Sequence, residues 1–237
     1  MQHASWGSRR ALIARNFLFA NLAAAELDKV LALARVTRYA PREVVWRKGD
    51  YGNGMMAVLK GHVKLGAHAA SGREITFGIV KPGEIFGEIA LLDGHERSVD
   101  ASTLDHCEIL FIDRRDFIPF LAGHPDIAIR LVAELCARLR RTGQKVEDSA
   151  LGLAPRLARA LLRLADHHGL PTPAGTRIDV RLSQRELGQL IGMSRESVNK
   201  QLGRWRRRGL IALDRRALVI RNPAPLRALA EPAGAIN

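Results

Sequence analysis

The chain has 237 residues, a hydrophobic fraction of 47% and a formal net charge of +13. This hydrophobic content excludes a disordered chain, and no apolar run approaches the roughly 20 residues of a membrane-spanning helix. The positive charge is concentrated, because residues 150–237 hold 16 Lys and Arg against 6 Asp and Glu, whereas residues 1–149 hold 21 against 18. Such a basic segment favours a nucleic-acid partner, and since no secretory signal is recognised, we expect a cytoplasmic protein without a membrane partner.

The first 124 residues change from a helical pattern to a strand pattern. Leu27, Val30, Leu31 and Ala34 recur at helical spacing, and after about Pro41 short apolar runs alternate with glycine-containing turns. The runs lie at residues 44–46, 55–59, 63–65, 75–80 and 109–112. Short strands with turn signals about every eight to twelve residues predict a compact β-barrel or sandwich.

A long helix is predicted from Pro125 to about Ala150. Apolar and small residues keep strict 4-3 spacing in it, at Ala128, Val132, Leu135, Leu139, Thr142, Val146 and Ser149. This spacing is typical of a two-stranded coiled coil, which predicts a homodimer with Val132, Leu135, Leu139, Thr142 and Val146 in its interface. The alternative is a helix that packs on its own barrel. Thr142 is a polar residue within this predicted interface, which we call the seam. It therefore either sets the register or contacts a ligand at the dimer axis.

The segment from residue 183 to residue 200 carries the pattern of two short helices joined by a tight turn. A further amphipathic helix at residues 156–168, a loop at 171–175 and an alternating strand at 177–182 precede it. Ser183 with Glu186 forms a capping box, Gly192 stands at the sharp turn, and Ser194 can cap the second helix. The pattern predicts a helix-turn-helix, followed by a hairpin that ends near Ile220.

The polar residues of this segment suit contacts with double-stranded DNA. Arg195, Glu196 and Lys200 lie on one side of the second helix and can read base edges. Other polar residues suit phosphate contacts, namely Ser183, Gln184, Arg185, Ser194 and Ser197, with Arg215 and Arg216 at the tip of the hairpin. The alternative is an amphipathic helical hairpin with solvated charges.

Gly87-Glu88, followed nine residues later by Arg97-Ser98, looks like the phosphate-binding cassette of cyclic nucleotide-binding domains. Together with the seam helix and the helix-turn-helix, this motif makes the chain resemble the cAMP receptor protein (CRP–FNR) superfamily from about Phe17 to Ile220. The resemblance implies an α+β fold with three parts. These are an effector domain of jelly-roll type at 1–124, a dimerisation helix at 125–149 and a winged helix-turn-helix domain at 150–237.

The resemblance also implies a ligand and the residues that bind it. The ligand would be a cyclic nucleotide, cAMP or cGMP, acting as an allosteric effector, with no further cofactor. Arg97 would bind the cyclic phosphate with Ser98 and the backbone after Gly87, and Glu88 would accept from the ribose 2′-hydroxyl. The purine would be lined by Phe77, Gly78, Val80, Phe86 and Ile89, with Arg138 and Thr142 approaching the base.

The implied protein is a homodimer that regulates transcription at a pseudo-palindromic DNA site, with RNA polymerase as a further candidate partner. One alternative keeps this architecture but responds to another effector or to none. A more distant alternative is a cyclic nucleotide-binding interaction subunit without a role on DNA. Neither Cys107 nor Cys136 has metal-ligand spacing, and no nucleophile–base pair is found, so neither a metal site nor an enzyme is predicted.

Overall fold

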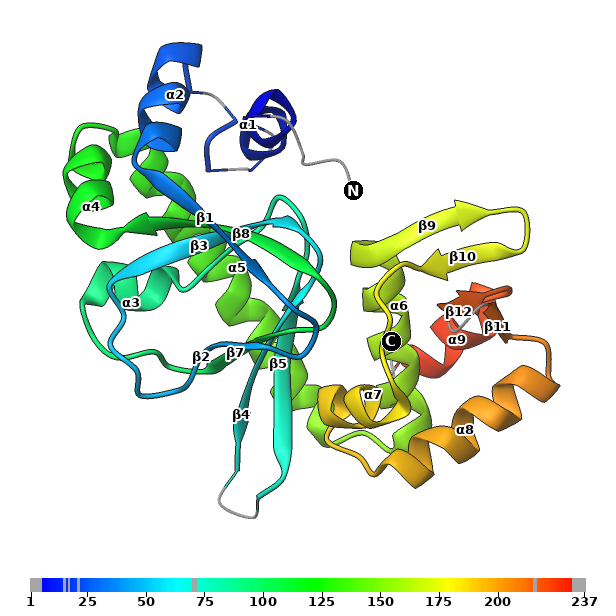
Figure 1. The fold of residues 1–237 in the computed structure, drawn as a ribbon. Coiled ribbons are helices and arrows are strands. Elements are labelled where there is room, and N and C mark those ends of the chain that lie inside the picture. Colours follow the sequence, from blue (N-terminus) through cyan, green and yellow to red (C-terminus); the bar gives the residue numbers. More distant parts are fainter. Residues whose placement is uncertain are drawn as a thin grey trace, which may run out of the picture. The chain divides into compact units, whose positions relative to one another are not determined.

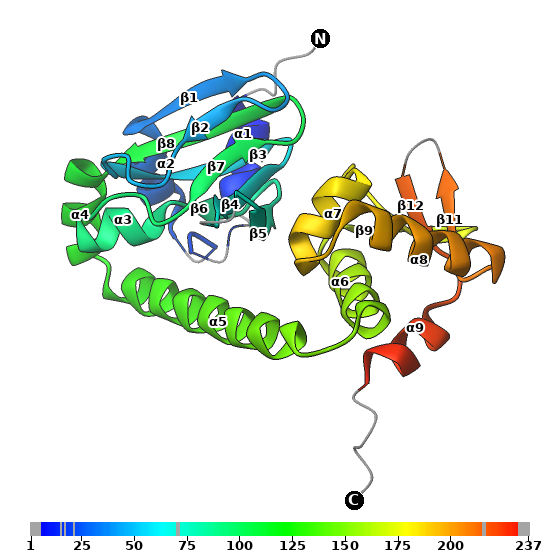
Figure 2. The same cartoon turned by 90° about the horizontal axis from the view of Figure 1, so that it is seen from below.

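The computed structural model describes residues 6–14, 16, 18–20, 22–69, 72–214 and 217–231 (Figure 1). The chain divides into two compact units. The first comprises Met1–Ala67 and Phe77–Arg141, and the second comprises His68–Thr76 and Thr142–Asn237. The boundary falls inside the long helix α5 (Pro125–Ser149), which Figure 2 shows as one unbroken helix. In the described part of the chain, no helix is both long and apolar enough to cross a bilayer.

The described part of the first unit combines eight strands with short helices, although the segment His68–Thr76, which includes the ends of two of these strands, is assigned to the second unit. The helices are α1 (Trp6–Ala14), α2 (Ala24–Ala32), α3 (Glu88–Asp93) and α4 (Arg114–Ala122). The strands are β1 (Ala34–Tyr39), β2 (Val44–Trp46), β3 (Gly54–Lys60), β4 (Val63–His68), β5 (Glu74–Val80), β6 (Ile85–Phe86), β7 (Asp100–Thr103) and β8 (Cys107–Asp113). They form two four-stranded sheets, in the orders β1-β8-β3-β6 and β2-β7-β4-β5.

Strand β8 contributes to two hydrophobic clusters, one on each of its faces. Its residues Cys107 and Ile109 belong to a cluster that also draws on β2, β4, β5 and β7, and therefore lies between the sheets. Leu110 and Ile112 belong to a second cluster, to which α1, α2, α4 and α5 contribute. A strand buried on both faces reads as a continuous apolar run, which is why residues 109–112 predicted a strand without alternation.

Two expectations for this unit need correction. The described strands pair as two separate sheets and are not closed into a barrel by hydrogen bonds, so the sandwich form of the prediction applies. The helical spacing was carried to Ala34, but α2 ends at Ala32 and Ala34 begins β1. Residues 34–39 pair with β8 along their whole length, and this long-range pairing overrides the local helical spacing.

The second unit holds the end of α5 and a helical domain with a small sheet. Its helices are α6 (Leu153–His168), α7 (Gln184–Ile191), α8 (Arg195–Arg207) and α9 (Pro223–Ala230). Its strands β9 (Gly169–Thr172), β10 (Gly175–Ile178), β11 (Ile211–Asp214) and β12 (Ala217–Ile220) form a sheet in the order β11-β12-β10-β9.

Local details of the second unit differ from the expectations. The loop expected at 171–175 is a hairpin between β9 and β10, and the strand expected at 177–182 ends at Ile178. Helix α6 begins at Leu153, so Pro155 lies in its first turn, where the missing N–H of proline costs no helical hydrogen bond. The hairpin after α8 is confirmed, because β11 and β12 pair from Ile211 with Ile220 to Asp214 with Ala217.

Candidate functional site

The turn between β6 and α3 is shaped by Gly87. Its φ of +80° lies in the left-handed region, which favours glycine. A Cβ atom at this position would lie 2.6 Å from Nη1 of Arg97 and 3.0 Å from Cη2 of Trp46. The glycine therefore provides both the backbone conformation of the turn and the room that the Arg97 side chain occupies.

The Arg97 side chain is buried next to this turn. The residue is 4% exposed, its Nη1 donates to the Gly87 carbonyl oxygen at 2.9 Å, and its guanidinium lies over the Trp46 ring at 4.1 Å. Burial lowers the pKa of Arg97, while the carboxylates of Glu88 and Asp50 oppose this effect by favouring its charged form. Since arginine stays protonated in proteins, the site holds a desolvated permanent cation, which suits an anionic ligand.

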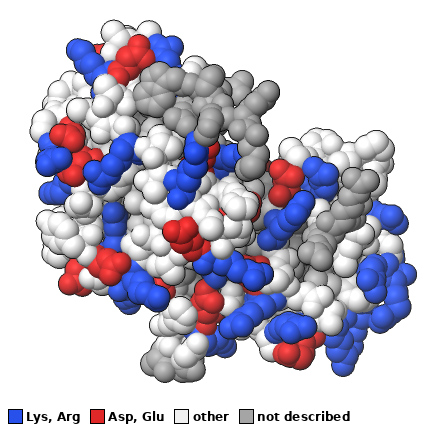
Figure 3. Space-filling view, viewed as in Figure 1, with Lys and Arg blue, Asp and Glu red and all other residues white. Residues whose placement is uncertain are grey.

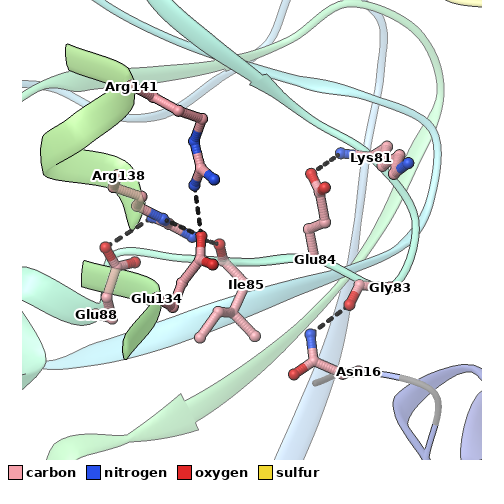
Figure 4. A network of polar contacts seen from close by, with 9 residues as sticks. All are labelled: Asn16, Lys81, Gly83, Glu84, Ile85, Glu88, Glu134, Arg138 and Arg141. Atoms are coloured by element: carbon pink, nitrogen blue, oxygen red, sulfur yellow. Dashed lines mark hydrogen bonds and ion pairs between the residues drawn. The ribbon is translucent and has the colours of Figure 1, made fainter. Parts of the chain in front are cut away.

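Glu88 is an almost completely buried acid at the start of α3, and Arg138 of α5 reaches it. Nη1 of Arg138 donates to Oε1 of Glu88 at 2.7 Å, and Nη2 donates to the Ile85 carbonyl oxygen at 2.7 Å (Figure 4). Nε of the same guanidinium donates to Glu134, which also accepts from Arg141. The turn that carries Glu88 is thus tied to the long helix through a single guanidinium.

The structure brings Gly87, Glu88, Arg97 and Arg138 together and places the other predicted ligand residues differently. Val80 and Phe86 are buried in the core between the sheets, where Phe86 stacks on Trp46. The remaining candidates are more accessible: Gly78 is half-buried, and Phe77, Ile89, Ser98 and Thr142 are exposed. Thr142 follows Arg138 by one turn of α5 and falls in the second unit.

Three residues of this region were missed by the sequence analysis. Trp46 contacts Arg97, Asp50 favours its charge, and Glu134 binds Arg138. Glu134 and Arg138 are four residues apart in a predicted helix, and this spacing indicates an ion pair. Trp46 lies in a predicted strand, and its contact with a residue 51 positions away had no local signal.

Helix α5 exposes an apolar stripe. Ile129, Val132, Leu139 and Val146 are 71%, 59%, 74% and 67% exposed, and Cys136 and Gly143 are exposed between them. These positions follow 3-4 spacing. Val132, Leu139 and Val146 were predicted seam residues, whereas Leu135 and Ala128 are half-buried in the single chain. The exposed stripe therefore shares Val132, Leu139 and Val146 with the predicted seam. Its other positions, Ile129, Cys136 and Gly143, each follow a predicted seam residue by one.

The predicted caps of α7 and α8 are confirmed. Ser183 Oγ accepts from Glu186 N while the Glu186 carboxylate accepts from Ser183 N, which completes the capping box. Gly192 ends α7 with a φ of +66°, and Ser194 Oγ accepts from Ser197 N to cap α8. Because these contacts are local, they define where the two helices begin and how sharply the chain turns between them.

The second helix presents its polar residues to solvent. Arg195, Glu196 and Lys200 are exposed near its N-terminal end, while Val198 and Trp205 are buried on the opposite side. In the first helix Arg185 is exposed, whereas Gln184 donates to Asn199 at 3.0 Å. Arg215 and Arg216 lie outside the described residues. Figure 3 shows Lys and Arg side chains gathered on the face where α8 lies, an electrostatic arrangement suited to a polyanion.

The thiols and metal-binding side chains form no further site in the residues that can be described. No group of three His, Cys, Asp or Glu side chains is arranged to hold a metal ion there. Cys107 is buried, and burial together with the nearby Asp105 raises the pKa of its thiol to about 12. A thiol of this pKa is almost fully protonated at neutral pH, which disfavours a redox sensor at Cys107.

Comparison with known proteins agrees with both candidate sites, the region around Gly87 and the helix-turn-helix. Residues 36–124 match the family model of the cyclic nucleotide-binding domain, and residues 155–229 match that of the Crp-like helix-turn-helix domain. Over 177 residues the chain is 34% identical to the CRP-like cAMP-activated global transcriptional regulator of Mycobacterium tuberculosis, which covers 74% of this chain and 79% of that protein. It is 32% identical over 214 residues to the cyclic AMP receptor protein of Thermus thermophilus, with 90% and 96% covered.

Solved structures show the same architecture. The c-di-GMP responsive global regulator CLP of Xanthomonas campestris superposes with a TM-score of 0.71 at 27% identity, covering 84% of this chain and 99% of that chain. FixK2 of Bradyrhizobium japonicum superposes with a TM-score of 0.76, covering 85% and 99%, and at 21% identity this likeness concerns the fold alone.

Proposed function

The chain belongs to the CRP–FNR family of transcription regulators, and from this premise we propose that it is a homodimeric DNA-binding regulator controlled by a cyclic nucleotide. The family consists of transcription regulators rather than enzymes. In the proposed layout, residues 1–124 bind the effector, residues 125–149 form the dimer helix and residues 150–237 bind DNA.

The nucleotide part rests on one observation, the meeting of Arg97, Glu88 and Arg138 around the Gly87 turn. Figure 4 shows the contact between Arg138 and Glu88. The planar donors of Arg97 match the oxygens of a cyclic phosphate, and the Glu88 carboxylate can accept from a ribose hydroxyl. Because Arg138 belongs to α5, a nucleotide that contacts Glu88 changes the hydrogen bonds of the dimer helix directly. This is the route by which we expect the effector to alter DNA binding.

We take cAMP as the first candidate effector and cGMP as the second. The names of two relatives, at 34% and 32% identity, refer to cAMP. A structural relative at 27% identity, CLP of Xanthomonas campestris, is instead a c-di-GMP responsive regulator. The effector therefore has to be identified by titration, with a dinucleotide included among the ligands.

The dimer is proposed to form through the exposed stripe of α5, which is covered by a second copy of this chain. The apolar side chains at 3-4 spacing over residues 129–146 can pack between those of a parallel second copy. Exposure of Leu139 and Val146 to solvent is unfavourable, so covering them stabilises the dimer. From the family resemblance we expect a two-fold dimer to bind DNA with its α8 helices in successive major grooves, about 34 Å apart, which would require a pseudo-palindromic site. RNA polymerase remains a candidate partner on promoter DNA.

Calorimetric titration of the purified protein with cAMP, cGMP and c-di-GMP tests this function. We expect one cyclic mononucleotide per subunit, and we expect Arg97→Ala to abolish binding. The matched control is Arg115→Ala, which removes an exposed arginine of the same unit and should leave the affinity unchanged. Absence of binding by both mononucleotides would contradict control by cAMP or cGMP but not DNA binding, which selection from random DNA sequences measures separately.

A further inference from the structure

Trp46, at the end of β2, lies directly against the buried guanidinium of Arg97, with 4.1 Å between Cζ and the ring centroid. Two contacts hold the ring in place. Nε1 of Trp46 donates to the Val99 carbonyl oxygen at 2.8 Å, and the ring stacks on Phe86 with centroids 5.0 Å apart. We infer that Trp46 is a positioning residue that orients Arg97 for the phosphate of the ligand. The inference rests on the proposed nucleotide site.

The packing leaves Arg97 little freedom. The side chain is confined between the Trp46 ring and the Gly87 turn, where even a Cβ atom at Gly87 would come within 2.6 Å of Nη1. Its Nη1 is also anchored on the Gly87 carbonyl oxygen at 2.9 Å. An arginine side chain normally loses much rotamer freedom when it binds a ligand. With Trp46 in place this freedom is already restricted before the ligand arrives, which favours tight binding.

The chemistry of the contact suits a site that must receive an anion. Burial lowers the pKa of Arg97, so its charged form needs stabilisation inside the protein. A direct carboxylate partner would occupy the N–H edge of the guanidinium and compete with the phosphate. An aromatic ring instead stabilises the cation through its face, and the in-plane N–H donors stay directed outward from the stack.

The test compares Trp46→Leu with Trp46→Phe by calorimetric titration with cAMP and with cGMP. Leucine removes the aromatic face, and we expect affinity to fall about tenfold. Phenylalanine keeps a ring, and affinity should stay within about threefold of the wild type. Val58→Ala, which removes packing from the same core cluster, is the control for general loosening and should leave the affinity unchanged.

Two further readouts separate positioning from stability. In an Arg97→Lys background the effect of Trp46→Leu should largely disappear, because an ammonium group has no planar face to stack. Nucleotide should also change the tryptophan emission of the wild type but not that of Trp46→Phe. Trp6 and Trp205 are present in both proteins, so a change seen only in the wild type is assigned to Trp46.

The outcomes are distinguishable. If the wild type binds a nucleotide and Trp46→Leu binds it equally well, or if Val58→Ala weakens binding as much, the positioning role is wrong and the proposed function stands. If the wild type binds neither cAMP nor cGMP, the proposed nucleotide control is wrong and the role of Trp46 is overturned with it.

Discussion

Arg138 donates to the carboxylate of Glu88 across 2.7 Å, so the long helix α5 supplies the counter-charge of an acid that is buried at the start of α3. The two residues are 50 positions apart, and each belongs to a different functional element of the proposed regulator. Glu88 lies at the turn of the proposed effector site, and Arg138 lies on α5, the helix with the exposed apolar stripe. In the proposed regulator, a ligand bound to Glu88 would therefore reach α5 through the ion pair of Glu88 with Arg138.

Arg138→Ala should destabilise the first unit, because it leaves the Glu88 carboxylate buried without its partner. We expect the free energy of unfolding to fall by about 1–3 kcal/mol, measured by urea denaturation at neutral pH. Arg141→Ala is the control, since Arg141 is 44% exposed and its ion pair with Glu134 should contribute less than about 1 kcal/mol. The double variant Glu88→Gln with Arg138→Ala should recover part of the loss. Equal stability of Arg138→Ala and Arg141→Ala would show that the pair is not structural.

Arg195→Ala should weaken DNA binding selectively. Arg195 is exposed in the first turn of α8, where a side chain can reach a base edge in the major groove. We expect discrimination at one base position of the selected site to fall by about 1–3 kcal/mol, measured by competition binding with single-base variants. Arg185→Ala, in the first turn of α7, should weaken binding to all sequences alike. A uniform loss for Arg195→Ala would instead make this residue a phosphate contact.

Leu139→Glu should dissociate the dimer, because it places two carboxylates against each other in the proposed seam. Sedimentation equilibrium should show the monomer for this variant and the dimer for the wild type. Arg140→Glu changes the charge of a neighbouring exposed position off the stripe, and it should remain dimeric. A dimer that survives Leu139→Glu would refute the proposed seam.

Cys136 provides a second check on the same seam. It lies in the exposed stripe, so a short bismaleimide should cross-link two copies through it, and Cys136→Ser should abolish the product. The buried Cys107 should not substitute for it, because the pKa of its thiol is raised to about 12. Cross-linking that persists in Cys136→Ser would place the contact elsewhere.

Gly192→Ala should destabilise the helix-turn-helix by about 1 kcal/mol, because the residue ends α7 with a φ of +66° and alanine disfavours that conformation. Gly203→Ala in α8 is the matched control. A Cβ there would meet only Arg207 Nη1, at 3.8 Å, and alanine should stabilise the helix by up to about 1 kcal/mol. Thermal unfolding measures both. Equal shifts in melting temperature would mean that the left-handed turn is not required.

Features that depend on near neighbours could be predicted from the sequence alone. The capping box of Ser183 and Glu186, the turn at Gly192 and the periodicity of α5 all arise from residues within about one helical turn, so their spacing predicts them. The order of the cassette, the long helix and the helix-turn-helix also follows from motifs, and this order is what makes the sequence resemble its family.

Features that depend on contacts between distant segments became visible in the folded chain. In the structure β1 pairs with β8, Arg138 donates to Glu88, and the ring of Trp46 lies against the guanidinium of Arg97. The structure also shows which residues of α5 are covered within the chain, because Ile127 and Leu131 are buried in the core of the first unit while Leu139 and Val146 are exposed. Heptad spacing shows how often apolar residues recur along a helix. Which side of the helix faces its own domain depends on packing with residues far away in the chain.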